Sequence, residues 1–156
     1  MSSSMNLSVG IKGFKRGGNI LDIDVPEALK HRCSSGISWL DEALGGEGFA
    51  PSTSMMLTGG PGCGKTTLML QLADALTKAG HIALFNTGEE SLYQVKMVAD
   101  RLNLRHGFVP GQDIMVEDLL DHAEMLRKKH PTKQIFILQD SLQTLDDGKY
   151  TNGTNG

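Results

Sequence analysis

The stretch that decides the fold reads TGGPGCGKTTL over residues 58–68. It holds a glycine, four further residues and then Gly-Lys-Thr, a pattern typical of loops that wrap the phosphates of a nucleotide. Such loops bind through main-chain N–H groups that glycines allow to turn inward, and through the positive end of the helix that follows. We therefore predict a phosphate-binding loop made of Gly59, Gly60, Pro61, Gly62, Cys63, Gly64, Lys65, Thr66 and Thr67.

The side chains of this loop have separate expected roles. Lys65 supplies a mobile cation for the β- and γ-phosphates of ATP, and we expect it to face solvent in the empty loop. The Thr66 hydroxyl is a ligand for Mg²⁺, and Thr67 contacts the α-phosphate side. Cys63 is interpreted as a spacer, with a catalytic thiol as the alternative. The alternative for the whole stretch is a glycine-rich turn that carries a Lys-Thr pair by accident.

The flanking segments favour the phosphate loop over a simple turn. Residues 55–57 are apolar and bounded by Ser, Thr and Gly, which predicts a buried strand running into a turn. Leu68, Leu72 and Leu76 then recur every four residues until Gly80, which predicts a helix packed on a sheet. Strand, loop and helix thus follow in the order that the motif requires.

The rest of the chain alternates between apolar runs and helical spacing. We predict further strands at residues 81–87, 114–116 and 134–138. We predict further helices over residues 37–44, 92–102 and 119–126. This alternation indicates a parallel sheet with both faces covered. The predicted fold class is α/β, a three-layer P-loop NTPase with a mostly parallel sheet.

The chain divides into three parts by composition. Residues 1–32 are polar and weakly periodic, and we interpret them as an arm with a candidate edge strand at residues 20–25. Residues 33–145 form the predicted nucleotide-binding core. Residues 146–156 are acidic and then rich in Gly, Asn and Thr, so we expect a flexible tail.

Phosphoryl transfer from ATP also needs an acidic group for the magnesium shell, placed at the end of a strand beside the phosphate loop. Asp140 fits, because it follows the apolar run of residues 135–138, although Gln139 interrupts that run just before it. We predict Thr66 and Asp140 as the magnesium ligands. The alternative is that Asp140 only caps a turn with Ser141.

Hydrolysis further needs a carboxylate that orients or deprotonates the attacking water. Glu89 and Glu90 stand at the carboxyl end of the strand predicted after the P-loop helix. Since two adjacent carboxylates cannot both point into one site, we choose Glu89 as the base, beside Lys65 as the second catalytic residue. Glu90 is expected to cap the first turn of the next helix. The alternative is that both are simply acidic residues at a helix start.

Composition limits the classes of function. The formal net charge of −3 argues against a surface devoted to nucleic acid, so any DNA contact must be local. Two cysteines, Cys33 and Cys63, make neither a disulfide framework nor a structural zinc site. The sequence has no signal peptide pattern and no apolar run of membrane-spanning length. We therefore expect a soluble, cytoplasmic protein.

Several blocks of the sequence belong together: SGI at residues 35–37 with LD at 40–41 and LGG at 44–46, the phosphate loop, GEES at 88–91 and DSLQT at 140–144. Together these blocks resemble the RecA superfamily of P-loop ATPases, which implies a RecA-like fold. Bacterial RadA (Sms) is the most similar family, and KaiC-like and DnaB-like ATPases share parts of the pattern. The resemblance implies that Glu89 is the catalytic base and that Asp140 serves magnesium. It also implies ATP hydrolysis coupled to work on single-stranded DNA in recombination, repair or replication, within a homo-oligomeric ring or filament.

The sequence also departs from this pattern. RadA carries a four-cysteine zinc module that Cys33 and Cys63 cannot build, and the family core continues beyond the Asp-Ser strand. We therefore expect a truncated core, a fragment of a longer ATPase that is weakly active or inactive alone, with a naturally shortened relative that needs a partner as the alternative. The alternative functions are a KaiC-like regulatory module switched by nucleotide occupancy and an inactive nucleotide-binding fragment.

Overall fold

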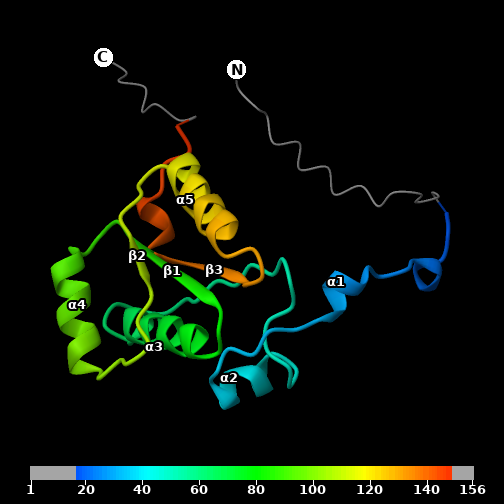
Figure 1. Cartoon of the computed structure of the whole chain (residues 1–156), viewed down its shortest axis with the longest axis horizontal. Helices are drawn as coiled ribbons and strands as arrows, with labels where there is room; N and C mark the ends of the chain where they lie inside the picture. Colours follow the sequence, from blue (N-terminus) through cyan, green and yellow to red (C-terminus); the bar gives the residue numbers. More distant parts are fainter. Residues whose placement is uncertain (1–16, 149–156) are drawn as a thin grey trace.

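Three strands form one parallel sheet in the computed structural model, which describes residues 17–148 (Figure 1). They are β1 (Ile82–Thr87), β2 (Val109–Gly111) and β3 (Ile135–Asp140), in the spatial order β2-β1-β3. β1 lies in the centre and pairs in parallel with both neighbours. Its almost complete burial explains the apolar run that begins it, because a central parallel strand is covered on both faces.

The side chains of β1 alternate between two helical layers. Ala83 and Phe85 point to the side of α3 (Lys65–Lys78) and belong to the larger core cluster. Leu84 points to the opposite side and packs with Leu119 and Leu126 of α5 (Val116–Lys129). α3 and α5 therefore cover opposite faces of the sheet, which gives the three-layer α/β architecture expected from the sequence (Figure 1).

The remaining helices are shorter. α4 (Leu92–Arg101) packs Val95 into the α3 side of the core. α2 (Ser38–Ala43) contributes Leu40 to the same cluster. Towards the amino end of the described chain lie α1 (Glu27–Lys30) and the 3-10 turn η1 (Ile20–Asp22), and after β3 comes the 3-10 turn η2 (Leu142–Thr144).

Most of the expected elements are confirmed with small shifts of their ends. The helices expected at residues 37–44, 92–102 and 119–126 are α2, α4 and α5, and the helix after the phosphate loop is α3. The strands expected at residues 81–87 and 134–138 are β1 and β3. The predicted arm and tail fall partly on residues 1–16 and 149–156, which lie outside the described residues.

Three expected strands are wrong. Residues 20–25 hold the turn η1 instead of an edge strand. Residues 114–116 make only an isolated bridge, between Met115 and Asp146. The strand expected there lies earlier in the chain, as β2, which starts six residues before Met115. Residues 55–57 are not a strand in the described sheet, and Met56 is 74% exposed. Apolar composition alone therefore did not determine burial here.

Candidate functional site

The phosphate loop joins residue 58 to the first turn of α3. Gly62 and Gly64 have φ values of +72° and +91°, a backbone region that side chains with a Cβ rarely adopt. Gly64 is also the N-cap residue of α3, so the loop leads directly into the positive end of that helix. Glycine at positions 62 and 64 is therefore favoured by the backbone path itself.

Lys65 lies across this loop. Its Nζ donates to the main-chain oxygens of Gly59 at 2.8 Å and Gly60 at 2.9 Å, and Cys63 Sγ is 3.9 Å away. The ammonium group folds back onto carbonyl oxygens of its own loop, and because these hydrogen bonds lie at exposed positions, it keeps access to solvent. Its partners within the described chain are neutral oxygens and a thiol, so the cation is held beside the loop without a carboxylate partner.

Thr66 and Asp140 meet although they are far apart in sequence. Thr66 Oγ1 donates to Asp140 Oδ2 at 2.6 Å. The contact follows from two features of the fold: Thr66 stands in the first turn of α3, and Asp140 ends β3 with its side chain on the α3 face. A hydroxyl and a carboxylate oxygen are the hard donors that Mg²⁺ prefers, and Mg²⁺ commonly uses only one or two protein carboxylates.

Glu89 follows β1 and reaches the end of β3. Its Oε1 accepts a hydrogen bond of 2.5 Å from Ser141 Oγ, and Ser141 comes directly after Asp140. The buried Thr87 side chain accepts from the main-chain N–H groups of Glu89 at 3.4 Å and Glu90 at 3.2 Å. The fold therefore gathers Thr66, Asp140, Ser141 and Glu89 at the carboxyl ends of β1 and β3.

Glu90 does not have the structural role expected of it. α4 begins at Leu92, and Ser91 caps it together with Gln94 in a reciprocal capping box. Glu90 precedes this cap, and the first turn of α4 holds no acidic residue. The sequence SLYQ at residues 91–94 carried the signal for this cap, because Ser followed three residues later by Gln is a helix-start pattern.

Two loop residues of the prediction make no side-chain hydrogen bond within residues 17–148. Pro61 is exposed in the loop, and Thr67 is partly buried in the first turn of α3. Sequence reasoning also missed two residues. The sequence predicts Ser141 only as a turn partner of Asp140 and Thr87 only as the end of a strand, yet both hydrogen-bond to Glu89. No local pattern separates these hydroxyl contacts from ordinary turn contacts.

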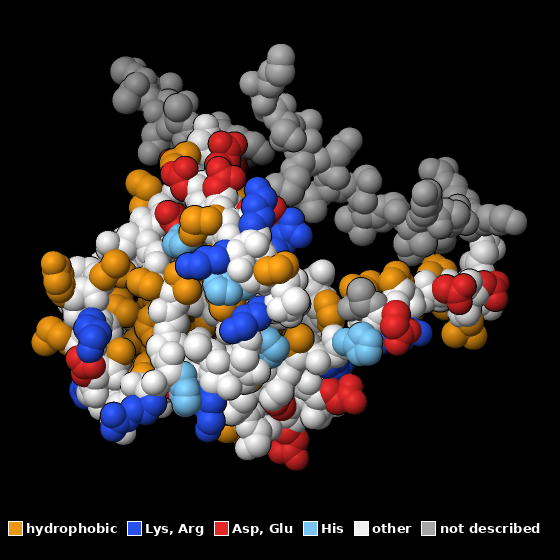
Figure 2. Space-filling model, viewed as in Figure 1, with side chains coloured by type: hydrophobic (Ala, Val, Ile, Leu, Met, Phe, Trp, Pro, Cys, Tyr) orange, Lys and Arg blue, Asp and Glu red, His pale blue; other side chains and the backbone are white. Residues whose placement is uncertain are grey.

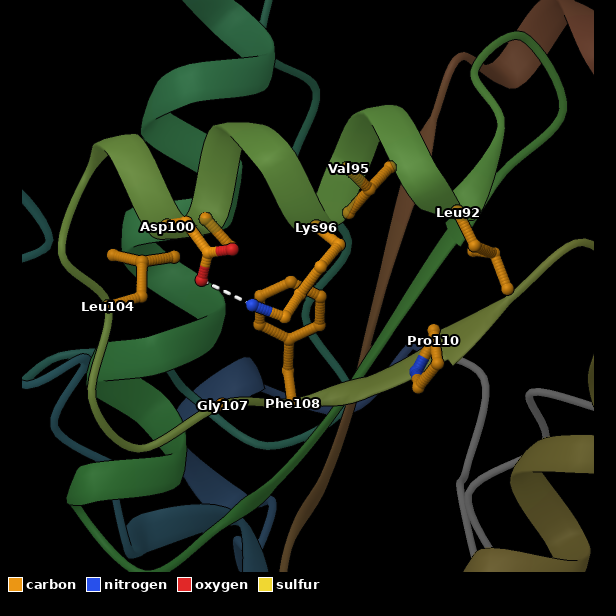
Figure 3. A pocket seen from close by; sticks show the side chains of 9 residues that line it. Leu92, Val95, Lys96, Asp100, Leu104, Gly107, Phe108 and Pro110 are labelled. Atoms are coloured by element: carbon orange, nitrogen blue, oxygen red, sulfur yellow. Dashed lines mark hydrogen bonds and ion pairs between the residues drawn. The ribbon is translucent and has the colours of Figure 1, made fainter.

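A hollow elsewhere on the surface is of a different kind. It lies between α4 and the β2 edge and is mostly apolar, with Val95 of α4 facing Phe108 and Pro110 (Figure 3). An ion pair between Lys96 and Asp100 borders it. None of the residues that line this hollow belongs to the phosphate loop or to the group of Thr66, Asp140, Ser141 and Glu89. The hollow is therefore separate from the candidate site.

On the face of the molecule shown in Figure 2, the charged side chains do not gather into a patch of one sign. Acidic and basic groups are interspersed over the face shown in Figure 2, in keeping with the net charge of −3. Within residues 17–148 no three His, Cys, Asp or Glu side chains are grouped as a metal-binding cluster. No helix of this part of the chain is long and apolar enough to cross a membrane.

Comparisons with known proteins bear on this site. The model of the family described as "ATPase: KaiC" matches residues 33–147. The chain is also similar to proteins named DNA repair protein RadA. It is 32% identical over 124 residues to that of Mycobacterium tuberculosis, covering 80% of this chain and 25% of that protein. It is 40% identical over 115 residues to that of Haemophilus influenzae, covering 73% and 23%.

A further relative is the DNA repair protein RadA of Rickettsia typhi, 43% identical over 101 residues, with 65% of this chain and 22% of that protein covered. The chain spans about a quarter of the length of these curated relatives. The matched family segment contains the phosphate loop, the Glu89 segment and Asp140.

Proposed function

Because this chain belongs to the KaiC ATPase family of the RecA superfamily, we propose that it binds ATP with Mg²⁺ and forms the nucleotide site of an ATPase that works on single-stranded DNA. The observation that carries the proposal is the hydrogen bond of 2.6 Å between Thr66 Oγ1 and Asp140 Oδ2. It supports a magnesium site directly beside a loop whose glycines have the backbone of a phosphate cradle.

Each side chain of the site has a proposed role. The main-chain N–H groups of the loop and the Lys65 ammonium bind the phosphates, and Thr66 and Asp140 hold Mg²⁺. When bound, the ion neutralises charge on the phosphate oxygens. Glu89 accepts the proton of the attacking water or orients it, and the hydrogen bond from Ser141 holds its carboxylate in place.

The DNA part of the proposal comes from the relatives, which are named DNA repair proteins. The interspersed surface charges favour a local contact with single-stranded DNA over an extended basic surface. We propose a homo-oligomeric ring or filament as the working form, and the cytoplasm as its compartment. The free thiols of Cys33 and Cys63 fit a reducing compartment.

The test measures linked binding of the two ligands. Binding of Mg·ATP by the chain is followed by calorimetry, alone and with a single-stranded oligonucleotide. If nucleotide and DNA sites are coupled, the oligonucleotide changes the affinity for ATP, and ATP changes the affinity for the oligonucleotide by the same factor. Absence of Mg·ATP binding would refute the nucleotide site. Binding of ATP without any binding of the oligonucleotide would refute the proposed role of single-stranded DNA. The proposed nucleotide site would be unaffected by that outcome.

A further inference from the structure

Two amide side chains lie side by side in the sheet where apolar residues would be expected. Asn86 of β1 is completely buried, and Gln139 of β3 is its direct partner in the strand register. By the alternation of the strands both are on the α5 face, following Leu84 and Ile137. A buried amide destabilises a core unless its hydrogen-bonding groups are satisfied, so the contacts of Asn86, and of the half-buried Gln139 beside it, need a physical explanation.

Asn86 is fixed from the β2 side. Its Nδ2 donates to the main-chain oxygen of Asp113 at 2.8 Å, and its Oδ1 accepts from the main-chain N–H of the same residue at 2.8 Å. His122 Nδ1 of α5 lies 2.9 Å from Asp113 Oδ2, which ties this loop to the helix. At Gly111 a Cβ atom would lie 2.6 Å from Asn86 Oδ1, so a residue without a side chain is required there.

Gln139 receives its orientation from Asn86. The second donor of Asn86 Nδ2 goes to Gln139 Oε1 at 2.7 Å. With its oxygen held there, the Gln139 amide must direct its nitrogen the other way. That nitrogen, Nε2, donates to the main-chain oxygen of Ser141 at 2.8 Å and to Thr144 Oγ1 at 3.2 Å.

The turn that Gln139 holds contacts the Glu89 segment at two points. Ser141 Oγ donates to Glu89 Oε1 at 2.5 Å. Thr144 Oγ1 also donates to the Ser141 oxygen at 2.7 Å, and its side chain packs so closely on Gly88 that a Cβ there would lie 2.4 Å from Oγ1. Movement of this turn would therefore displace Ser141, which is the hydrogen-bond partner of Glu89, and Gly88, which precedes Glu89.

We propose that Asn86 and Gln139, the amide relay, are positioning residues that set Ser141 and through it the carboxylate of Glu89. The amide relay itself touches no nucleotide. It acts by holding the turn of residues 141–144 against residues 88 and 89, so that the base is preorganised. The inference rests on the proposed function, because it takes Glu89 as the base for ATP hydrolysis.

The test replaces the Gln139 amide with an apolar side chain of similar length, Gln139→Met. Gln134→Met is the matched control, because it makes the same change at an exposed position directly before the same strand. Affinity for Mg·ATP is measured with a fluorescent ATP analogue. Hydrolysis is measured in a single turnover with the full 156-residue chain in excess. Hydrogen exchange reports the backbone order of residues 88–91 and 141–145.

We expect Gln139→Met to keep the nucleotide affinity within about twofold and to slow hydrolysis by at least about tenfold. Exchange becomes faster at both segments, and Gln134→Met behaves as the wild type. A side chain that only stabilises the sheet would alter the unfolding midpoint without changing hydrolysis by the folded protein. Unchanged hydrolysis together with unchanged exchange at residues 88–91 overturns the proposal.

A double-mutant cycle tests the route through Ser141. Ser141→Ala removes only the last hydrogen bond to Glu89. If Gln139 acts through Ser141, adding Gln139→Met to Ser141→Ala slows hydrolysis by less than about a further twofold. Rate effects that multiply as if independent overturn the proposed route.

The proposal can still be tested if Gln139→Met does not fold or if the wild type binds no Mg·ATP. If Gln139→Met does not fold, Thr144→Val removes the hydroxyl that joins Gln139 and Ser141 while keeping the side-chain shape, and it should raise exchange at residues 88–91 in the same way. If the wild type binds no Mg·ATP, the proposed function fails. The exchange comparison then decides the amide relay alone: faster exchange at residues 88–91 supports it, and unchanged exchange overturns it.

Discussion

At the scale of single residues, substitution of Lys65 should weaken nucleotide binding without changing the stability of the fold. Its ammonium contacts only the loop, at the oxygens of Gly59 and Gly60 and near the Cys63 thiol. We expect Lys65→Ala to weaken Mg·ATP binding at least tenfold, about 1.4 kcal/mol, because the phosphates lose their mobile cation. The free energy of unfolding should change by less than about 0.5 kcal/mol, as for other surface changes.

Calorimetric titration and urea unfolding check the two halves of this prediction. Lys78→Ala, in the last turn of the same helix, is the control for loss of a helical lysine. Equal affinities for Lys65→Ala and the wild type would contradict the role assigned to Lys65.

The choice between the two adjacent glutamates is a second prediction at this scale. Glu89→Gln keeps an oxygen that can accept from Ser141 but cannot take a proton, so Mg·ATP should still bind. Single-turnover hydrolysis should fall by about 10²-fold or more, the usual contribution of a general base. Glu90→Gln should hydrolyse ATP as the wild type does. The opposite pattern, with loss only in Glu90→Gln, would show that the wrong neighbour was chosen.

Sequence reasoning reached these residues because their roles have local signals. The glycine spacing predicts the loop, and an acidic residue after an apolar run predicts Asp140 at a strand end. The fold of Lys65 back onto Gly59 and Gly60 has no such signal, because it depends on where carbonyl oxygens point after the loop has turned. The same holds for Ser141, whose partner is 52 positions away in sequence.

At the scale of elements, the misplaced third strand has a physical explanation. β2 consists of Val109, Pro110 and Gly111, a composition that predicts a turn. Proline is tolerated there because β2 lies at the edge of the described sheet, where an N–H group on the outer side has no partner to lose. The apolar residues 114–116 carry the strand-like composition instead, although Ile114 and Met115 lie between β2 and α5 and Val116 begins α5.

The start of β1 provides a prediction about pH. His81 directly precedes that strand, and its ring packs edge-on against Phe136 with centroids 5.3 Å apart. Partial burial lowers the pKa of His81 below its ordinary value of 6.5, because it disfavours the charged ring. As the pH falls through 6.5, the unfolded chain takes up a proton that the folded chain resists, so stability falls. Above that pH the ring is neutral in both states, and this effect is absent.

We therefore expect the urea midpoint of the wild type to drop more between pH 8 and pH 5.5 than that of His81→Phe, which keeps the ring contact without a titrating group. His31→Phe, at an exposed position on the carboxyl side of α1, should keep the wild-type drop. Identical pH dependence in His81→Phe and the wild type would show that His81 makes no such contribution.

At the scale of the whole molecule, the three-layer arrangement was predictable and the links between its layers were not. Alternating strands and helices are sufficient for a parallel sheet with α3 and α5 on opposite faces. The amide relay joins β1 to β3 across 53 positions, and Asn86 also holds Asp113, in the loop after β2, across 27 positions. Such contacts arise only when the register of three strands is fixed, so periodicity cannot reveal them.

The exposure of apolar side chains also belongs to this scale. Residues 55–57 and Ile137 of β3 remain substantially exposed, and within residues 17–148 the only strand that pairs with β3 is β1. Burial of residues 55–57 is predicted from their apolar composition alone, which does not show whether another segment packs against them. Cover is a property of the assembled surface, which a single segment does not determine.

The last prediction concerns turnover by this chain as it stands. Negative charge that develops on the transferred phosphate is met in related chemistry by an arginine from outside the loop, worth about 10³- to 10⁵-fold in rate. Among the described residues, no arginine side chain hydrogen-bonds to Thr66, Asp140, Ser141 or Glu89. The chain also spans only about a quarter of its curated relatives. We therefore expect it to bind Mg·ATP and to hydrolyse it far more slowly than about once per second, the low end of ordinary enzyme turnover.

Steady-state hydrolysis, measured across protein concentration and with and without a single-stranded oligonucleotide, checks this expectation. If a neighbouring copy supplies the missing cation, the rate per chain rises with concentration, whereas a self-sufficient site gives a constant rate per chain. Lys65→Ala is the background control, because residual phosphate release by that variant measures contaminating activity. Turnover near one per second at low concentration, absent in Lys65→Ala, would mean that Lys65, Thr66, Glu89 and Asp140 are sufficient for catalysis without a cation from another segment or copy.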